Sequence, residues 1–144
     1  MKMNKRVISF FLAVTLCAGF LAAPVCAAEA RSSDYLSTYT ASLRQGSGSG
    51  EIDLTYFVRT NSGTMTYIGI SKIEVYRSGG GHYMTINGST ANGLLKASAV
   101  SASGTYTIHC AASTSYYCVV TFIAQNASGS DTRTVTTASA IAHP

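Results

Sequence analysis

The chain has 144 residues, of which 47% are hydrophobic and 11% are charged, and its formal net charge at pH 7 is +4. Three of its ten Lys and Arg residues lie within the first six positions, so the remainder of the chain is nearly neutral. The positive net charge therefore gives no support for nucleic-acid binding, which depends on basic residues gathered on one face.

Residues 1–28 have the three zones of a secretory signal peptide. A basic start is followed by an apolar run from Val7 to about Leu21 and then by small residues. A membrane anchor is the alternative, but the run is shorter than the roughly 18 residues of a membrane span. We expect a helical signal peptide that is cleaved after Ala27 or Ala28.

The rest of the chain is long enough for one domain with one core. We expect a flexible lead over 29–34 and a single domain over 35–144. Thr, Ser, Gly, Tyr, Val and Ile are frequent, Trp is absent, and such a composition favours strands over helices. The predicted product is a secreted, extracellular all-β domain with no membrane contact after cleavage.

Apolar and polar residues alternate over 35–43 and again over 51–59, as they do in half-buried strands. The inward face of the second strand is predicted to hold Ile52, Leu54, Tyr56 and Val58. Apolar positions over 64–77 are spaced less regularly, which predicts a bend or bulge near Gly69.

A glycine-rich hairpin turn is predicted over 78–81, followed by a short edge strand over 82–86. A weak strand over 94–99, a strand over 104–110 and a last strand over 132–141 also fit the pattern. The regular strand over 116–124 is predicted to bury Tyr116, Cys118, Val120, Phe122 and Ala124. About seven short strands favour a β-sandwich, with a small barrel as the alternative.

The segment from Tyr116 to Gly129 reads Tyr-x-Cys-x-Val-x-Phe-x-Ala-x-Asn-x-x-Gly. It resembles the F strand and F–G turn of fibronectin type III domains. Tyr116 stands two residues before Cys118, which is the position of the tyrosine corner in immunoglobulin-like sandwiches. The resemblance implies an immunoglobulin/fibronectin type III-like β-sandwich. No cysteine lies in the strand over 51–59, so an antibody-type disulfide is excluded.

A broader resemblance covers most of the chain after the predicted signal peptide. The segment from Met65 to Gly69 and the turn from Asn126 to Asp131 are similar to those of a family of small secreted proteins of Gram-positive bacteria. That family is a domain of unknown function. The resemblance therefore implies an exported bacterial domain but assigns no catalytic residue.

Cys110 and Cys118 are the cysteines that remain after signal cleavage. Export and an even count favour a disulfide between them. A metal site is the alternative, but only His109 lies nearby, so the ligands of a zinc site are missing. The spacing is also not the C-x-x-C of a redox motif. We expect a disulfide and no metal.

Glu51 and Asp53 lie two residues apart on the outward face of one predicted strand. Paired acids catalyse glycoside hydrolysis when a cleft holds them at a set separation, but a solvated strand face is the simpler interpretation. Asp131 is interpreted as a turn residue that caps local backbone N–H groups. His82, His109 and His143 are scattered, and His109 should face solvent. The pattern predicts no enzyme and no cofactor.

Several tyrosines lie at positions that the period-two pattern does not assign to the core. Tyr67, Tyr76 and Tyr83 form the candidate binding surface, because tyrosine offers a rigid amphipathic contact area. The alternative is that they simply fit strands. We predict a secreted, non-enzymatic protein that binds an unknown extracellular protein, a cell wall or a glycan. A small secreted effector or bacteriocin-like protein is the alternative function.

Overall fold

The computed structural model describes residues 35–144, which form nine β-strands and contain no helix that could cross a membrane. The strands are β1 (Leu36–Gln45), β2 (Glu51–Thr60), β3 (Met65–Arg77), β4 (His82–Asn87), β5 (Leu95–Ala99), β6 (Ser101–His109), β7 (Ser115–Asn126), β8 (Gly129–Thr136) and β9 (Ala140–Ile141). The predicted signal peptide and flexible lead lie outside the described residues. The all-β prediction is confirmed.

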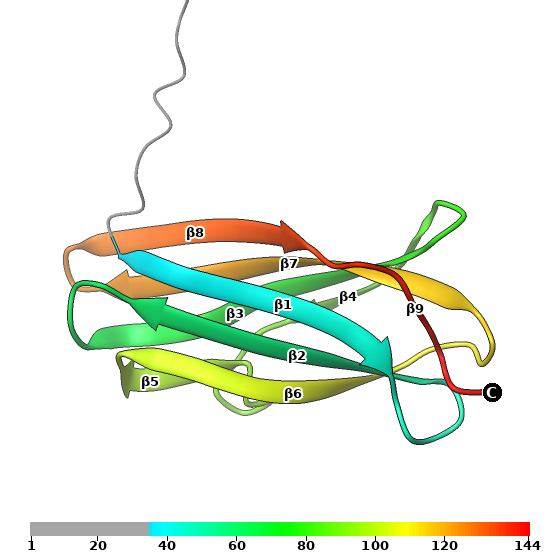
Figure 1. Ribbon diagram of the computed structural model, residues 1–144. Helices are drawn as coiled ribbons and strands as arrows, with labels where there is room; N and C mark the ends of the chain where they lie inside the picture. The colour runs from blue at the N-terminus through cyan, green and yellow to red at the C-terminus, as the bar shows by residue number, and fades with distance from the viewer. Residues whose placement is uncertain (1–34) are drawn as a thin grey trace, which may run out of the picture. The chain divides into compact units, whose positions relative to one another are not determined.

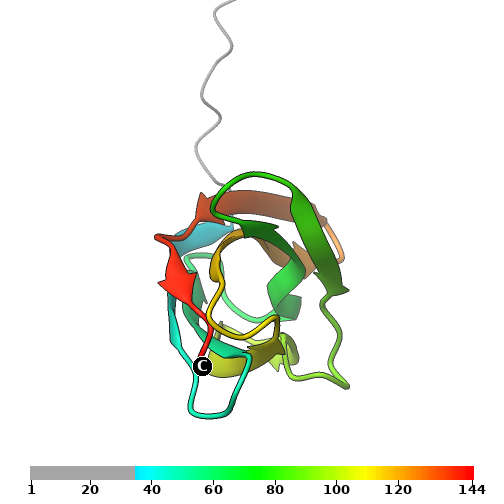
Figure 2. The same cartoon turned by 90° about the vertical axis from the view of Figure 1, so that its right-hand side faces the viewer.

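The strands form two antiparallel sheets that face each other in an open, sandwich-like arrangement (Figure 1). Sheet A has the order β1-β2-β6, and sheet B has the order β4-β3-β7-β8, with β5 beside β3 and β9 beside β7. The end-on view in Figure 2 shows the strands of both sheets around the core. No strand pairing joins the two sheets within the described part of the chain, so the barrel alternative does not apply.

The core forms where the inward faces of the two sheets meet. All four inward residues predicted for β2 and all five predicted for β7 are buried. Burying a large apolar side chain contributes about 1.5–3 kcal/mol, so these two strands anchor the sandwich. The period-two pattern of the sequence therefore identified both inner faces correctly.

Strand β3 is irregular in the middle, as its sequence predicted. Its register with β7 shifts between Ile70 and Lys72, and Gly69 has a φ of 149°. On the other edge, β3 pairs with β5 before this bulge and with β4 after it. A Cβ atom on Gly69 would collide with the carbonyl oxygen of Leu94, and one on Gly88 would collide with that of Ile70. Two close backbone approaches thus depend on glycine.

The end of the chain differs from the single last strand that was predicted. Strand β8 stops at Thr136, and the buried Thr137 bonds to the backbone of β7. The N–H of Cys118 donates to Thr137 Oγ1 at 3.0 Å, and the N–H of Thr137 donates to the Cys118 carbonyl at 2.9 Å. This clamp redirects the chain, and a short separate strand, β9, follows it.

Candidate functional site

A cluster of aromatic side chains lies on the outer face of sheet B, beside the glycine-rich hairpin between β3 and β4. Tyr76 of β3 is directly opposite Tyr117 of β7, and their rings stack at 5.3 Å between centroids with an interplanar angle of 11°. The His82 ring meets Tyr76 edge-on at 5.4 Å. Cross-strand aromatic pairs of this kind stabilise a sheet and leave ring surface towards solvent.

Three serine hydroxyls lie at the same end of sheet B. Ser78 Oγ is 2.7 Å from Ser115 Oγ and 3.0 Å from Ser139 Oγ. Ser78 lies two residues after Tyr76, in the turn that follows β3. Ser115 lies two residues before Tyr117, at the start of β7. Residues two apart share a face, at about 6–7 Å along the strand. We call Tyr76, Tyr117, His82, Ser78, Ser115 and Ser139 the aromatic–serine site.

The local sequence explains why the site forms at this end. The turn from Arg77 to Gly81 is closed by backbone hydrogen bonds, and Gly80 and Gly81 have φ values of 94° and 100°. Glycine adopts this left-handed region without steric cost. The turn places His82 next to Tyr76, while the Ser78 N–H donates to the Ser115 carbonyl at 2.9 Å.

Of the three tyrosines predicted as a surface, only Tyr76 belongs to the site. Tyr67 is 40% exposed but lies nine residues earlier on β3, roughly 30 Å away at the usual rise per residue. Tyr83 points inward, because the register of β3 and β4 shifts next to Tyr76. Its ring packs against Tyr116 at 5.1 Å and under Arg77 at 5.2 Å.

The sequence analysis did not identify Tyr117 or the serines. A signal for Tyr117 was present, because it alternates with the buried Tyr116 and must therefore face outward. Its pairing with Tyr76 could not be predicted, since it depends on the register between two strands whose paired tyrosines are 117 − 76 = 41 positions apart in the chain. The serines meet only through the same register and the late turn at Ser139.

The two cysteines do not form the predicted disulfide. Cys110 follows β6 in sheet A, Cys118 lies in β7 of sheet B, and both are free thiols. The connection between the sheets is held instead by the buried Tyr116, whose hydroxyl accepts the N–H of Ala111 at 3.1 Å. An even cysteine count and export favour pairing but do not determine which side chains meet.

The Cys118 thiol is buried and the Cys110 thiol is half-buried. Burial, followed by the neighbouring Cys110, raises the pKa of the Cys118 thiol from its ordinary value of 9.0 to about 12. Burial also raises the pKa of Cys110. A thiol is a nucleophile or metal ligand only as the thiolate, so neither cysteine is activated at neutral pH.

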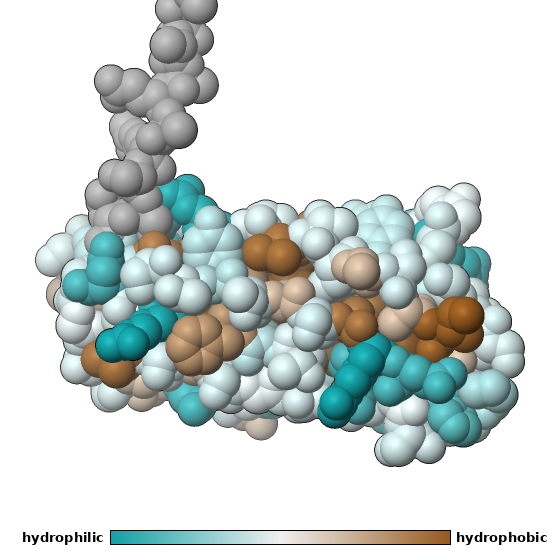
Figure 3. Space-filling model, viewed as in Figure 1, coloured by the Kyte–Doolittle hydropathy of each residue, from teal (hydrophilic) through white to brown (hydrophobic). Residues whose placement is uncertain are grey.

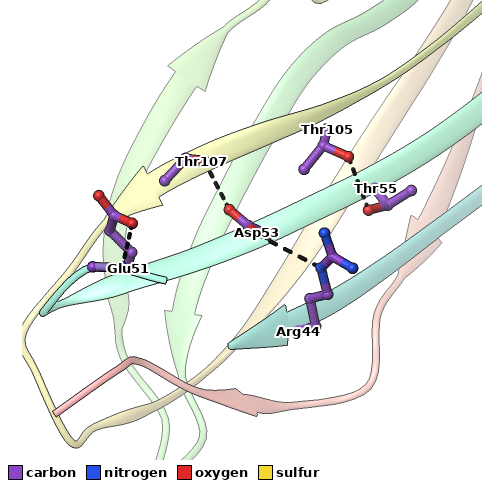
Figure 4. Close-up of polar contacts among 7 residues, drawn as sticks. Arg44, Glu51, Asp53, Thr55, Thr105 and Thr107 are labelled. Atoms are coloured by element: carbon purple, nitrogen blue, oxygen red, sulfur yellow. Dashed lines mark hydrogen bonds and ion pairs between the residues drawn. The ribbon is translucent and has the colours of Figure 1, made fainter. Parts of the chain in front are cut away.

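Asp53 lies on the outer face of sheet A, where side chains of the two neighbouring strands contact its carboxylate (Figure 4). The Thr107 hydroxyl donates to Asp53 Oδ1 at 2.7 Å, and Arg44 Nε lies 3.7 Å from Oδ2. One residue pair further along, the hydroxyls of Thr55 and Thr105 are 3.2 Å apart. These contacts cross all three strands of sheet A and give Asp53 a structural role.

Glu51 has a similar role at the turn before β2. Its carboxylate accepts the N–H of Gly48 at 2.7 Å and lies 3.6 Å from His109 Nδ1. The side chain of His109 is 78% exposed, as the sequence predicted. The two acids therefore each stabilise local structure.

Asp131 reaches well beyond its own turn, whereas the sequence-based interpretation gave it only local backbone partners. Its Oδ2 accepts the N–H groups of Tyr35 and Leu36 at 3.5 and 3.3 Å, so it joins β8 to the start of β1. The turn itself is capped by Asn126, whose Oδ1 accepts the N–H groups of Ser128 and Gly129. The carboxylate thus joins the two sheets at their edge.

The outer face of sheet A offers no comparable concentration of aromatic groups. Figure 3 shows this face as mostly of intermediate hydropathy, with apolar patches scattered over β1, β2 and β6. Phe57, 38% exposed, is the large aromatic residue that stands out on it. Isolated apolar residues of this kind are ordinary for a protein surface.

Within residues 35–144, no group of three or more His, Cys, Asp or Glu side chains is arranged to hold a metal ion. Comparisons with family models, curated proteins and solved structures find no match for the chain. What is established is therefore the all-β fold of two antiparallel sheets and the geometry of its surfaces. The resemblance to a family of small secreted bacterial proteins stays a prediction.

Proposed function

We propose that the chain is a secreted, non-enzymatic β-sandwich protein that binds a neutral glycan outside the cell through the aromatic–serine site. The observation that carries the proposal is the stacked pair of Tyr76 and Tyr117 next to three clustered serine hydroxyls. The signal-peptide pattern of residues 1–28 supports export.

The chemistry of the site favours a sugar over a charged ligand. Aromatic side chains pack against the apolar C–H faces of pyranose rings, and neighbouring hydroxyls exchange hydrogen bonds with sugar hydroxyls. The six residues of the site include no Asp, Glu, Lys or Arg. On the same face, Lys72 and Glu74 are paired with each other at 3.2 Å, so their charges offset. Arg77, between Tyr76 and Ser78 in the chain, directs its guanidinium over the ring of Tyr83.

We also propose that the fold is the immunoglobulin/fibronectin type III-like sandwich that the F-strand resemblance implies. The strand orders β1-β2-β6 and β4-β3-β7-β8 agree with the A-B-E and C′-C-F-G sheets of fibronectin type III domains. The hydrogen bond between Tyr116 and Ala111 agrees with a tyrosine corner. Such folds carry many functions, so the glycan assignment depends on the site alone.

The non-enzymatic assignment is supported by the roles of the candidate catalytic groups. Asp53 and Glu51 are held by neighbouring side chains and backbone, and burial keeps the Cys118 thiol protonated. A hydrolase that uses two carboxylates needs both of them beside a substrate cleft. We therefore expect no turnover when the protein is incubated with soluble glycosides or with peptidoglycan.

Binding is tested by screening the protein from residue 29 onward against an array of neutral and acidic glycans. Calorimetry with the best neutral glycan should then show that Tyr117→Ala weakens binding at least about tenfold, because a stacking ring is lost. Tyr67→Ala is the matched control, since Tyr67 is an exposed tyrosine on the outer face of the same sheet.

Two results would contradict the proposal. Equal losses in Tyr117→Ala and Tyr67→Ala would show that the aromatic–serine site is not the binding surface. Failure of every glycan to bind, together with Tyr117-dependent capture of a protein from culture supernatant, would replace the glycan by a protein ligand.

A further inference from the structure

Strand β6 leaves one whole edge of sheet A unpaired. It pairs with β2 over Ser101–His109, and the described residues include no partner strand on its other side. Ser103, Gly104 and Thr105, in the middle of the strand, are all exposed. An unpaired row of backbone N–H and C=O groups is a template for a further strand.

The hydrogen bonds between β6 and β2 show which residues of β6 direct their backbone N–H and C=O groups to this open edge. The Cys110 N–H donates to the Gly50 carbonyl and the Thr60 N–H donates to the Val100 carbonyl, so even-numbered residues around β6 bond to β2. Because bonded and non-bonded positions alternate along an antiparallel pair, the odd-numbered residues direct their N–H and C=O groups outward. These residues are Ser101, Ser103, Thr105, Thr107 and His109.

The other outer strands have features that block strand addition, and β6 lacks them. Edge strands are commonly blocked by charged residues, bulges or short length. Strand β5 carries Lys96, β8 carries Asp131 and Arg133, β1 carries Arg44, and β4 has six residues and a register shift. Strand β6 has nine residues, regular register and no Pro, Lys, Arg, Asp or Glu.

We propose that β6 pairs with β6 of a second copy of this chain, in antiparallel orientation about a two-fold axis at Thr105. This axis lies at the middle of the nine-residue strand, so all five outward residues find partners. Thr105 then faces Thr105 of the other copy. The result is a continuous sheet of six strands that joins two sheets A.

The side chains of β6 suit a second copy. Pairing about Thr105 places the exposed Gly104 opposite the half-buried Tyr106, so that a small residue meets a large one, and it places Ala102 opposite Ile108, which are both buried within their own sandwich. Shifting the axis to Thr107 would instead oppose Tyr106 and Ile108. The two-fold axis places residue 105 opposite itself and every other residue of β6 opposite a different one, and no residue of β6 carries a permanent charge that could repel a second copy. The proposal goes beyond glycan binding and uses a different sheet.

The test is sedimentation velocity of the protein from residue 29 onward, between micromolar and millimolar concentration. We expect a concentration-dependent dimer that Thr105→Pro abolishes. The Thr105 N–H points to the open edge, so proline there removes no bond to β2 and the far-UV circular dichroism should be retained. A wild-type protein that stays monomeric throughout, or a dimer that persists in folded Thr105→Pro, would overturn the proposal.

Charge substitutions test the position of the axis. Thr105→Lys and Thr105→Glu should each raise the dimer dissociation constant at least about tenfold, because like charges face each other at the axis. An equimolar mixture of the two variants should dimerise again. Thr40→Lys, on exposed β1 of the same face, is the control and should dimerise like the wild type. A mixture that remains monomeric would exclude an axis at Thr105.

Discussion

The two sheets of this protein are built differently. In sheet A, β2 and β6 pair without interruption, and the polar side chains on the outer face contact one another across the strands. In sheet B, β3 is bulged against β7, its other edge is shared by two short strands, and Thr137 turns the chain inward after β8. The polar side chains on the outer face of the regular sheet contact one another, and the irregular sheet presents the aromatic–serine site.

This difference shows how irregularity positions side chains. The shift beside Tyr76 turns the half-buried Tyr83 towards the core and leaves Tyr76 on the outer face with Tyr117 and His82. Bulges redirect side chains in this way because an extra residue changes the alternation of a strand. The function proposed for sheet B therefore depends on departures from ideal strand geometry, whereas the register shift of sheet A lies at the start of β1, between Leu36 and Thr38.

The largest expected effect comes from Gly88→Ala, which breaks the close approach of two segments in sheet B. The new Cβ atom would collide with the Ile70 carbonyl oxygen, so backbone must move beside the β3 bulge. We expect the free energy of unfolding in urea to fall by about 3 kcal/mol. Gly79→Ala, at a position with open space around it, is the control and should change stability by less than about 0.5 kcal/mol. Equal effects would refute the steric explanation.

An intermediate effect is expected from the buried thiol of Cys118 in β7. The unfolded thiol ionises near pH 9, whereas in the folded state burial raises the pKa of Cys118 to about 12. Its contribution to stability is complete below pH 9 and is lost as the pH rises from 9 to about 12, by up to about 1.4 kcal/mol per unit.

Urea denaturation from neutral pH to about pH 10.5 measures this loss. The wild type should lose stability more steeply with pH than Cys118→Ala, in which the group is absent. Comparing the slopes of the two proteins removes the shared titration of tyrosines. Parallel pH profiles would show that the Cys118 thiol does not keep its proton.

The smallest effect is expected on the regular sheet. Asp53→Asn weakens the contacts to Arg44 and Thr107 on the outer face of sheet A. Because Arg44 is 69% exposed, the loss should be at most about 1 kcal/mol and should shrink at high salt. Glycan binding should stay unchanged, which a calorimetric titration checks. A large fall in stability would mean that the polar contacts of sheet A matter more than their exposure indicates.

Much of the interior was predictable from the sequence. The alternation in β2 and β7 identified the buried residues, and the irregular spacing in β3 predicted the bulge near Gly69. Such patterns are local, since consecutive side chains of a strand point to opposite faces whatever the strand pairs with. The edge position of β4 and the exposure of His109 followed from the same reasoning.

Contacts between distant residues were less predictable. The expected disulfide between Cys110 and Cys118 is absent. An even cysteine count and an oxidising compartment favour pairing, but they do not determine the distance and orientation of the two side chains. Asp131 accepts hydrogen bonds from residues 95 and 96 positions away, at the start of β1, which a local interpretation of its turn did not predict. Both outcomes depend on how the two sheets pack against each other, which no single segment of the sequence encodes.

The sequence by itself determined the strand class, the inner face of each regular strand and the glycine-dependent turn, because each follows from the chemistry of neighbouring residues. Only the tertiary structure decided that Tyr117 meets Tyr76, that Tyr83 turns inward and that the edge of β6 stays open. These outcomes depend on strand register and sheet order, which shift whole sets of side chains together and leave no trace in any single segment.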